Sequence, residues 1–134
     1  MQYSLSEIIC KIIQTRDILQ IYHWNTKSFA RHKASDDLVQ ELTSQMDKFV
    51  EVYMGINKDS NVTINKKITL KSYYDTQIST CLVDLLNYLE DLTLESRDRT
   101  YLRKSKKRVT SDLLNIRDDM MNEIHKTLYL FTLS

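Results

Sequence analysis

Four side chains of the types that commonly bind transition metals are regularly spaced between residues 32 and 51: His32, Asp36, Asp47 and Glu51. His32 and Asp36 are four residues apart, and so are Asp47 and Glu51. Residues at this spacing are neighbours on the surface of an α-helix, so each pair can bind one ion. Imidazole and carboxylate ligands without cysteine suit iron or manganese, with zinc as an alternative. We call these four residues the His/carboxylate stripe.

The His/carboxylate stripe lies on a different side of the expected helix from the side that a core would bury. At about 100° per residue, its four side chains fall within a sector about 100° wide. The large apolar side chains of the same segment fall on another side: Leu38, Leu42, Met46, Phe49 and Tyr53. We therefore expect the histidine and the carboxylates to form a separate polar face.

One chain cannot bring the whole stripe to a single metal centre. The two pairs lie about 16 Å apart along a straight helix, whereas ligand bonds to these metals are about 2 Å long. A second copy of the helix, packed antiparallel about a two-fold axis near Leu42, would remove this difficulty. The first pair of one chain would then face the second pair of the other, which predicts two equivalent sites shared between subunits.

The tripeptide His23-Trp24-Asn25 lies at the end of the preceding helical pattern. Followed by the stripe, it resembles the signature of the Dps family, the mini-ferritins (DNA-binding proteins from starved cells). The resemblance implies a di-iron ferroxidase centre across a dimer interface, with three ligands from one subunit and two from its partner. In order, the implied ligands are His23, His32, Asp36, Asp47 and Glu51.

The resemblance also implies a reaction, in which hydrogen peroxide or oxygen oxidises Fe(II). It further implies that a hollow dodecamer stores the ferric mineral and so protects DNA. Asp36 and Glu51 are expected to contact the metal directly, with Glu51 as a bridge, because carboxylates bind iron in both oxidation states. Asp47 is expected to orient a histidine through its N–H. Trp24 would scavenge oxidising equivalents.

Each of these residues also has an ordinary structural explanation. The stripe could be a solvated helix face, which is common on surface helices. Ser35 is a plausible N-cap, and Asp36 in the first helical turn would then stabilise the positive end of the helix dipole. Trp24 could be a packing residue.

A run of cations between residues 97 and 108 is the second candidate site. Its side chains could contact phosphates in a salt-sensitive and sequence-independent manner. This gives an alternative function, a non-enzymatic architectural protein of the same fold that packages nucleic acid. Alternatively, this run of cations is a solvated loop. A third interpretation of the whole protein is a purely structural helical oligomer. The candidate DNA-binding residues are Arg97, Arg103, Lys104, Lys106, Lys107 and Arg108.

Composition and periodicity predict an all-α protein with one domain over residues 1–134. One glycine and no proline in 134 residues argue against a fold with many tight turns. Apolar residues at helical spacing predict helices near 5–27, 36–55, 70–95 and 110–132, with Gly55 as a C-cap and a polar loop over 57–69. We expect an antiparallel ferritin-like four-helix bundle with one longer connection.

The net charge and the apolar segments of the sequence indicate where in the cell the protein is expected. The net charge is +1, so no overall field attracts the chain to DNA or membranes. The sequence has no run of 18 apolar residues and no basic-then-apolar leader, which predicts a cytoplasmic or DNA-associated protein that is neither secreted nor in a membrane. Cys10 and Cys81 are expected to be reduced core residues.

Overall fold

The computed structural model describes residues 3–96 and 109–134, and the regular structure within them is entirely helical. The helices are α1 (Leu5–Asn25), α2 (Phe29–Ile56), α3 (Ile78–Ser96) and α5 (Ser111–Phe131). The all-α prediction is therefore confirmed for the described residues. The first and last helices lie within two residues of their predicted ends, whereas α2 and α3 begin elsewhere than predicted.

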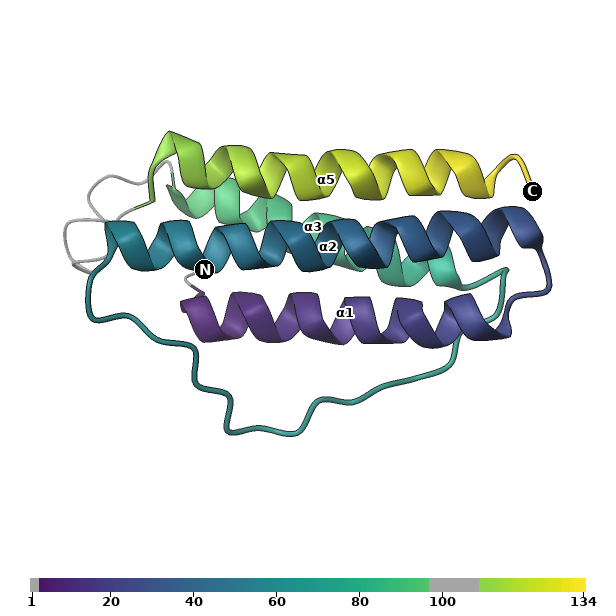
Figure 1. Ribbon diagram of the computed structural model, residues 1–134, viewed down its shortest axis with the longest axis horizontal. Coiled ribbons are helices and arrows are strands. Elements are labelled where there is room, and N and C mark those ends of the chain that lie inside the picture. Colours follow the sequence, from purple (N-terminus) through teal and green to yellow (C-terminus); the bar gives the residue numbers. More distant parts are fainter. Residues whose placement is uncertain (1–2, 97–108) are drawn as a thin grey trace.

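The four described helices lie side by side with their axes nearly parallel (Figure 1). α2 and α3 each contact both α1 and α5, but they do not contact one another. Figure 1 shows that each helix runs opposite to the neighbours that it contacts. Residues 57–77 join α2 to α3 and pass along the outside of α1 from one end of the molecule to the other. We call this stretch the crossover segment.

The core is formed where the apolar faces of the helices meet. Leu38 and Leu42 of α2 are buried, as are Phe49 and Tyr53, about two and three turns beyond Leu42. Full burial of such side chains contributes about 1.5–3 kcal/mol each, so the predicted apolar face of α2 is confirmed. Cys10 and Cys81 are both buried and both free of disulfide bonds, as expected.

The start of α2 differs from the prediction. Ser28, not Ser35, is the N-cap, and its hydroxyl accepts a hydrogen bond from the Arg31 N–H at 3.2 Å. Ser35 lies inside the helix and donates its hydroxyl to the Arg31 carbonyl at 2.7 Å. Asp36 therefore lies beyond the first turn, and the explanation of Asp36 as a residue of the helix start is wrong.

The predicted C-cap at Gly55 is also wrong. α2 continues through Gly55 to Ile56, and Asn57 is the C-cap, with its N–H bonded to the Tyr53 carbonyl at 2.8 Å. Gly55 does not have a positive φ. Among the described non-glycine residues, it is Asp59 that has a positive φ angle, of 67°.

The third helix begins at Ile78 and not at Leu70. Residues before Ile78 are held in the crossover segment by contacts with other elements, which compete with helix formation. The Thr69 carbonyl accepts from Gln14 Nε2 at 3.0 Å, and the Asp75 carbonyl accepts from Arg31 Nη1 at 3.0 Å. These contacts hold the backbone on either side of residues 70–74, the first part of the helix that apolar spacing predicted over 70–95.

Candidate functional site

His23 and His32 face one another where α1 ends and α2 begins. Their rings are stacked, with centroids 3.9 Å apart and planes inclined by 20°. His23 Nδ1 lies 2.6 Å from the His32 carbonyl oxygen, and His32 Nδ1 lies 2.9 Å from the His23 carbonyl oxygen. Each side chain is therefore bonded to the backbone of the other residue, and the pair clamps the two helix ends together.

These two contacts fix which ring nitrogen carries the proton. A carbonyl oxygen only accepts hydrogen bonds, so Nδ1 is the donor on both rings. In the neutral imidazole Nε2 then keeps its lone pair. Nε2 is the ring atom opposite the Cγ–Nδ1 bond, and on both rings that bond faces the two backbone segments. On each ring Nδ1 is thus engaged by the backbone of the other residue, and Nε2 takes no part in these two contacts.

The local sequence explains why the two histidines meet. Only Thr26, Lys27 and Ser28 separate the two helices, so the chain reverses direction at once. The His23 carbonyl is one of the last four of α1, which have no partner within the helix. His32 Nδ1 supplies that missing partner. The Ser35 hydroxyl lies 3.4 Å from His23 Nδ1 and donates to the His32 carbonyl at 3.1 Å.

The rest of the His/carboxylate stripe lies on the outer side of α2, as predicted. Asp36 is partly buried and accepts from Gln40 Nε2 at 3.1 Å. Asp47 and Glu51 are exposed and have no hydrogen-bond or ion-pair partner among residues 3–96 and 109–134. Because α2 is continuous, Glu51 lies roughly 28 Å along its axis from His32. The structure thus brings His23 to His32 but leaves the second carboxylate pair remote from them.

No three His, Cys, Asp or Glu side chains of the described residues form a group that could hold a metal ion. Within the described residues, no third side chain of these types joins the two histidines. Two large exposed apolar side chains flank the pair: Trp24 is 67% exposed and Phe29 is 79% exposed. The interpretation of Trp24 as a packing residue within the chain is wrong, since two thirds of it is open to solvent.

Arg31 is the residue that sequence reasoning missed. Its Nε donates to Ser134 Oγ at 2.7 Å, its Nη1 to the Tyr22 hydroxyl at 3.0 Å and its Nη2 to the Phe131 carbonyl at 3.1 Å. The guanidinium also lies 4.8 Å from the centre of the Phe131 ring. With the bond to the Asp75 carbonyl, Arg31 connects α1, the crossover segment and the end of α5. It does so one residue before His32.

The carboxylate of Asp75 belongs to the same cluster. It accepts hydrogen bonds from the Tyr22 hydroxyl at 2.7 Å and from Thr26 Oγ1 at 2.9 Å. The Tyr22 hydrogen bond is the main reason that the pKa of Asp75 lies below its ordinary value, and Thr26 and the Arg31 charge act in the same direction. Burial raises the pKa of Tyr22, against the hydrogen bond from Arg31. Arg31 has no periodicity or motif that would have revealed this cluster.

The second candidate site falls outside the described residues. Every cation proposed for nucleic-acid contact belongs to the stretch 97–108, so the prediction of DNA binding stays a prediction: Arg97, Arg103, Lys104, Lys106, Lys107 and Arg108. Among the described helices, none is both long and apolar enough to span a membrane.

Most of the chain, including the candidate site, matches a known protein family. The family described as "Family of unknown function (DUF5856)" matches residues 23–131, a stretch that begins at His23. An uncharacterized 14.6 kDa protein of the mobD-ri intergenic region of Enterobacteria phage T4 is 54% identical over 33 residues. That match covers 25% of this chain and 26% of the phage protein. No solved structure matches the chain.

Proposed function

The chain belongs to the DUF5856 family, whose function is unknown, and we propose that it is a mini-ferritin-like ferroxidase. In this proposal it oxidises Fe(II) with peroxide or oxygen at a site shared between two subunits and retains the ferric product. The observation that carries the proposal is the His23–His32 pair. A backbone carbonyl holds Nδ1 on each ring, and histidines that bind metals are typically oriented in this way, with the other ring nitrogen left for the metal.

The stacked geometry favours one ion for each imidazole. A metal bound to imidazole lies in the plane of the ring, about 2 Å from the nitrogen. The two planes are inclined by only 20° at a centroid separation of 3.9 Å, so no point at bonding distance lies in both. The stack therefore offers one nitrogen to each of two ions. Ions in two-metal sites are about 3.5–4 Å apart, which is close to the ring spacing.

Carboxylates would complete such a site. Asp36 is on the same helix as His32, one turn further along. In the proposed antiparallel dimer, Asp47 and Glu51 of the partner copy reach the His pair about a two-fold axis near Leu42. Their exposure and their lack of partners within the described residues support this role, because no described side chain competes for them.

The helix arrangement supports the ferritin-like part of the proposal. One long crossover joining two helices of the same direction is characteristic of ferritin-like bundles. The crossover segment joins α2 and α3, which run in the same direction and lie diagonally across the bundle (Figure 1). Manganese or zinc are alternative occupants of the same nitrogen and oxygen ligands.

Each residue has a definite task in the proposed reaction. His23 and His32 bind incoming Fe(II) as neutral donors, and the carboxylates offset the added positive charge as the iron becomes ferric. Trp24 is exposed beside His23 and can donate an electron to an oxidising species that escapes the site. A hollow dodecamer that stores the mineral and protects DNA completes the proposal.

Stopped-flow absorbance after Fe(II) and peroxide are mixed with the protein tests the activity. Asp36→Ala combined with Glu51→Ala should slow formation of the ferric species at least about a hundredfold, because loss of even a ligand-orienting residue costs ten- to a hundredfold. Asp37→Ala, an exposed carboxylate of α2 outside the stripe, is the matched control and should leave the rate unchanged. An unchanged rate in the double variant would sink the proposal.

The tautomer and the stoichiometry are separate tests. Long-range ¹H–¹⁵N correlation spectra should show Nδ1–H and an unprotonated Nε2 on both His23 and His32 at alkaline pH. Native mass spectrometry with Fe(II) should show an even-numbered oligomer that binds iron in pairs. A monomer that binds no iron would contradict the shared site.

A further inference from the structure

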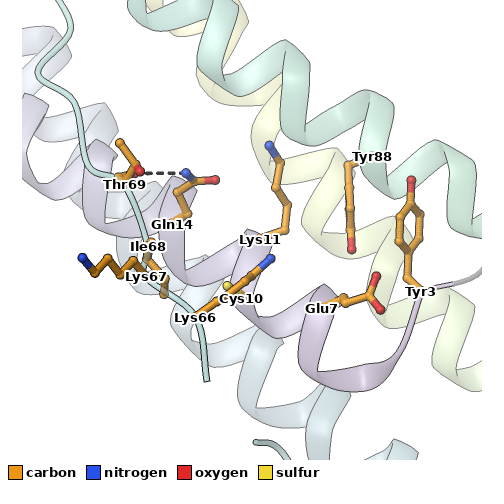
Figure 2. Close-up of a pocket in the computed structure, with 10 residues that line it drawn as sticks. All are labelled: Tyr3, Glu7, Cys10, Lys11, Gln14, Lys66, Lys67, Ile68, Thr69 and Tyr88. Atoms are coloured by element: carbon orange, nitrogen blue, oxygen red, sulfur yellow. Dashed lines mark hydrogen bonds between the residues drawn. The ribbon is translucent and has the colours of Figure 1, made fainter. Parts of the chain in front are cut away.

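A cleft of about 330 Å³ lies between the first half of α1, the crossover segment and Tyr88 of α3 (Figure 2). None of the residues of the His pair or of the His/carboxylate stripe lines it. Its volume falls at the lower end of the range for small-molecule sites, about 300–1,000 Å³. The cleft is therefore large enough for a small metabolite and independent of the proposed iron site.

Two hydrogen bonds fix the crossover segment against α1 on either side of the cleft. The Thr63 N–H donates to Ser6 Oγ at 2.9 Å, and Gln14 Nε2 donates to the Thr69 carbonyl at 3.0 Å. The second of these is drawn in Figure 2. Lys66 and Lys67 lie between the two anchoring points. Their backbone is thus held at a fixed place above α1.

The lining of the cleft is rich in cations. Lys66 and Lys67 have no ion-pair partner among the residues that the structure describes. Lys11 Nζ lies 2.5 Å from Asp84 Oδ2, so this carboxylate balances the charge of Lys11. Figure 2 shows the Lys66 ammonium directed over Cys10 into the cleft. Glu7, near the aromatic end, is the carboxylate of the lining. The Lys67 side chain points the other way in Figure 2, away from Lys11 and Tyr88. Lys66 therefore supplies the positive charge that an anion bound in the cleft would meet.

An aromatic wall closes the opposite end of the cleft. Tyr3 and Tyr88 are stacked there, with ring centroids 4.3 Å apart, and both line the cleft in Figure 2. Such a wall provides apolar surface for the organic part of a ligand. Cations at one end and aromatic rings at the other suit a molecule with one strongly anionic group and one planar or apolar group.

We propose that this cleft binds a small phosphate monoester, with its phosphate at Lys66 and its organic part toward Tyr88. Lysine acts as a point charge that suits a phosphate dianion. The crossover segment is anchored on both sides of Lys66, which keeps this side chain at the cleft and lowers the ordering cost of binding.

Equilibrium dialysis of the full chain tests the proposal with AMP, adenosine and inorganic phosphate as probes. AMP should bind saturably, and Lys66→Gln with Lys67→Gln should weaken its binding about tenfold or more, because charge-assisted hydrogen bonds are lost. Lys33→Gln with Lys58→Gln removes the same charge from exposed sites outside the cleft and should change binding by less than about twofold. Thermal unfolding confirms that both double variants are folded.

Three outcomes would overturn the assignment. If AMP does not bind saturably, the cleft is not a binding site. If the Lys66 and Lys67 variant binds AMP as tightly as the unchanged protein, these lysines do not bind the phosphate. If adenosine binds as tightly as AMP, the phosphate group does not contribute to binding. Inorganic phosphate that binds as tightly as AMP would show that the aromatic end contributes nothing, against the proposed orientation.

Discussion

The two halves of α2 use their polar side chains in opposite ways. In the first half, Arg31, His32 and Ser35 are bonded to α1, to the crossover segment or to backbone groups of their own turn, and Arg31 reaches the end of α5 as well. In the second half, Asp47 and Glu51 are exposed and without partners among the described residues. The apolar face is continuous through both halves, so the difference is confined to the polar face.

This difference separates the residues that hold the chain together from those that are available to a partner. The first half orders the end of the bundle and orients the His pair. The second half contributes two carboxylates that make no hydrogen bond or ion pair with the described residues. If those carboxylates serve a second copy, their removal should affect iron chemistry and leave folding intact, whereas changes in the first half should affect folding.

Arg31→Met should have the largest effect on stability. The variant loses four hydrogen bonds and the ring contact with Phe131, and it leaves several partly buried acceptors unpaired. We expect the free energy of unfolding to fall by about 2–4 kcal/mol, measured by urea denaturation followed by circular dichroism.

Arg31→Lys keeps the charge but loses the planar fork, so its loss of stability should be intermediate. If Arg31→Met is as stable as the unchanged protein, the cluster around Arg31 does not order this end of the bundle. The contrast between the two halves of α2 would then be lost.

Asp75→Asn should have a smaller effect that depends on pH. The pKa of Asp75 is lowered from its ordinary value of 3.8, chiefly by the Tyr22 hydrogen bond. A lowered pKa in the folded state means that the stability contributed by Asp75 is complete above 3.8 and is lost as the pH falls through the folded value. Urea midpoints between about pH 5 and about pH 2.5 should therefore decline less steeply in Asp75→Asn. Identical slopes would contradict the assignment.

Asp47→Ala with Glu51→Ala should have the smallest effect on stability. Both side chains are exposed, and surface substitutions of this kind change the free energy of unfolding by less than about 0.5 kcal/mol. The same variant should lose iron oxidation. A large loss of stability in dilute monomer would show that these carboxylates have a structural task within one chain.

The fold could be predicted from sequence to the extent that it depends on apolar periodicity. The buried faces and the limits of α1 and α5 follow from the local spacing of apolar residues. The start of α2 could not be predicted, because Ser28 and Ser35 are both acceptable caps and the chain reversal decides between them. The start of α3 could not be predicted either, since Arg31 and Gln14 hold the crossover segment through contacts distant in sequence.

The positions of the candidate residues on α2 were predictable, but their contacts were not. Helical spacing placed the stripe on the outer face of α2, where the structure has it. The stack of His23 on His32 is a tertiary contact between two helix ends, and the backbone carbonyls that fix both tautomers have no signature in the sequence. The Arg31 cluster joins three elements beyond α2, so no window of local sequence contains it.

The central claim is that each iron site takes ligands from two copies of the chain, and subunit complementation tests it most directly. One variant carries His32→Ala and Asp36→Ala, the other Asp47→Ala and Glu51→Ala, and each alone should be inactive. After the two are unfolded and refolded together, half of the dimers are mixed and each mixed dimer holds one intact site of two. The account predicts recovery of about one quarter of the unchanged protein's rate of Fe(II) oxidation. A mixture that stays as inactive as its two components would contradict the shared site.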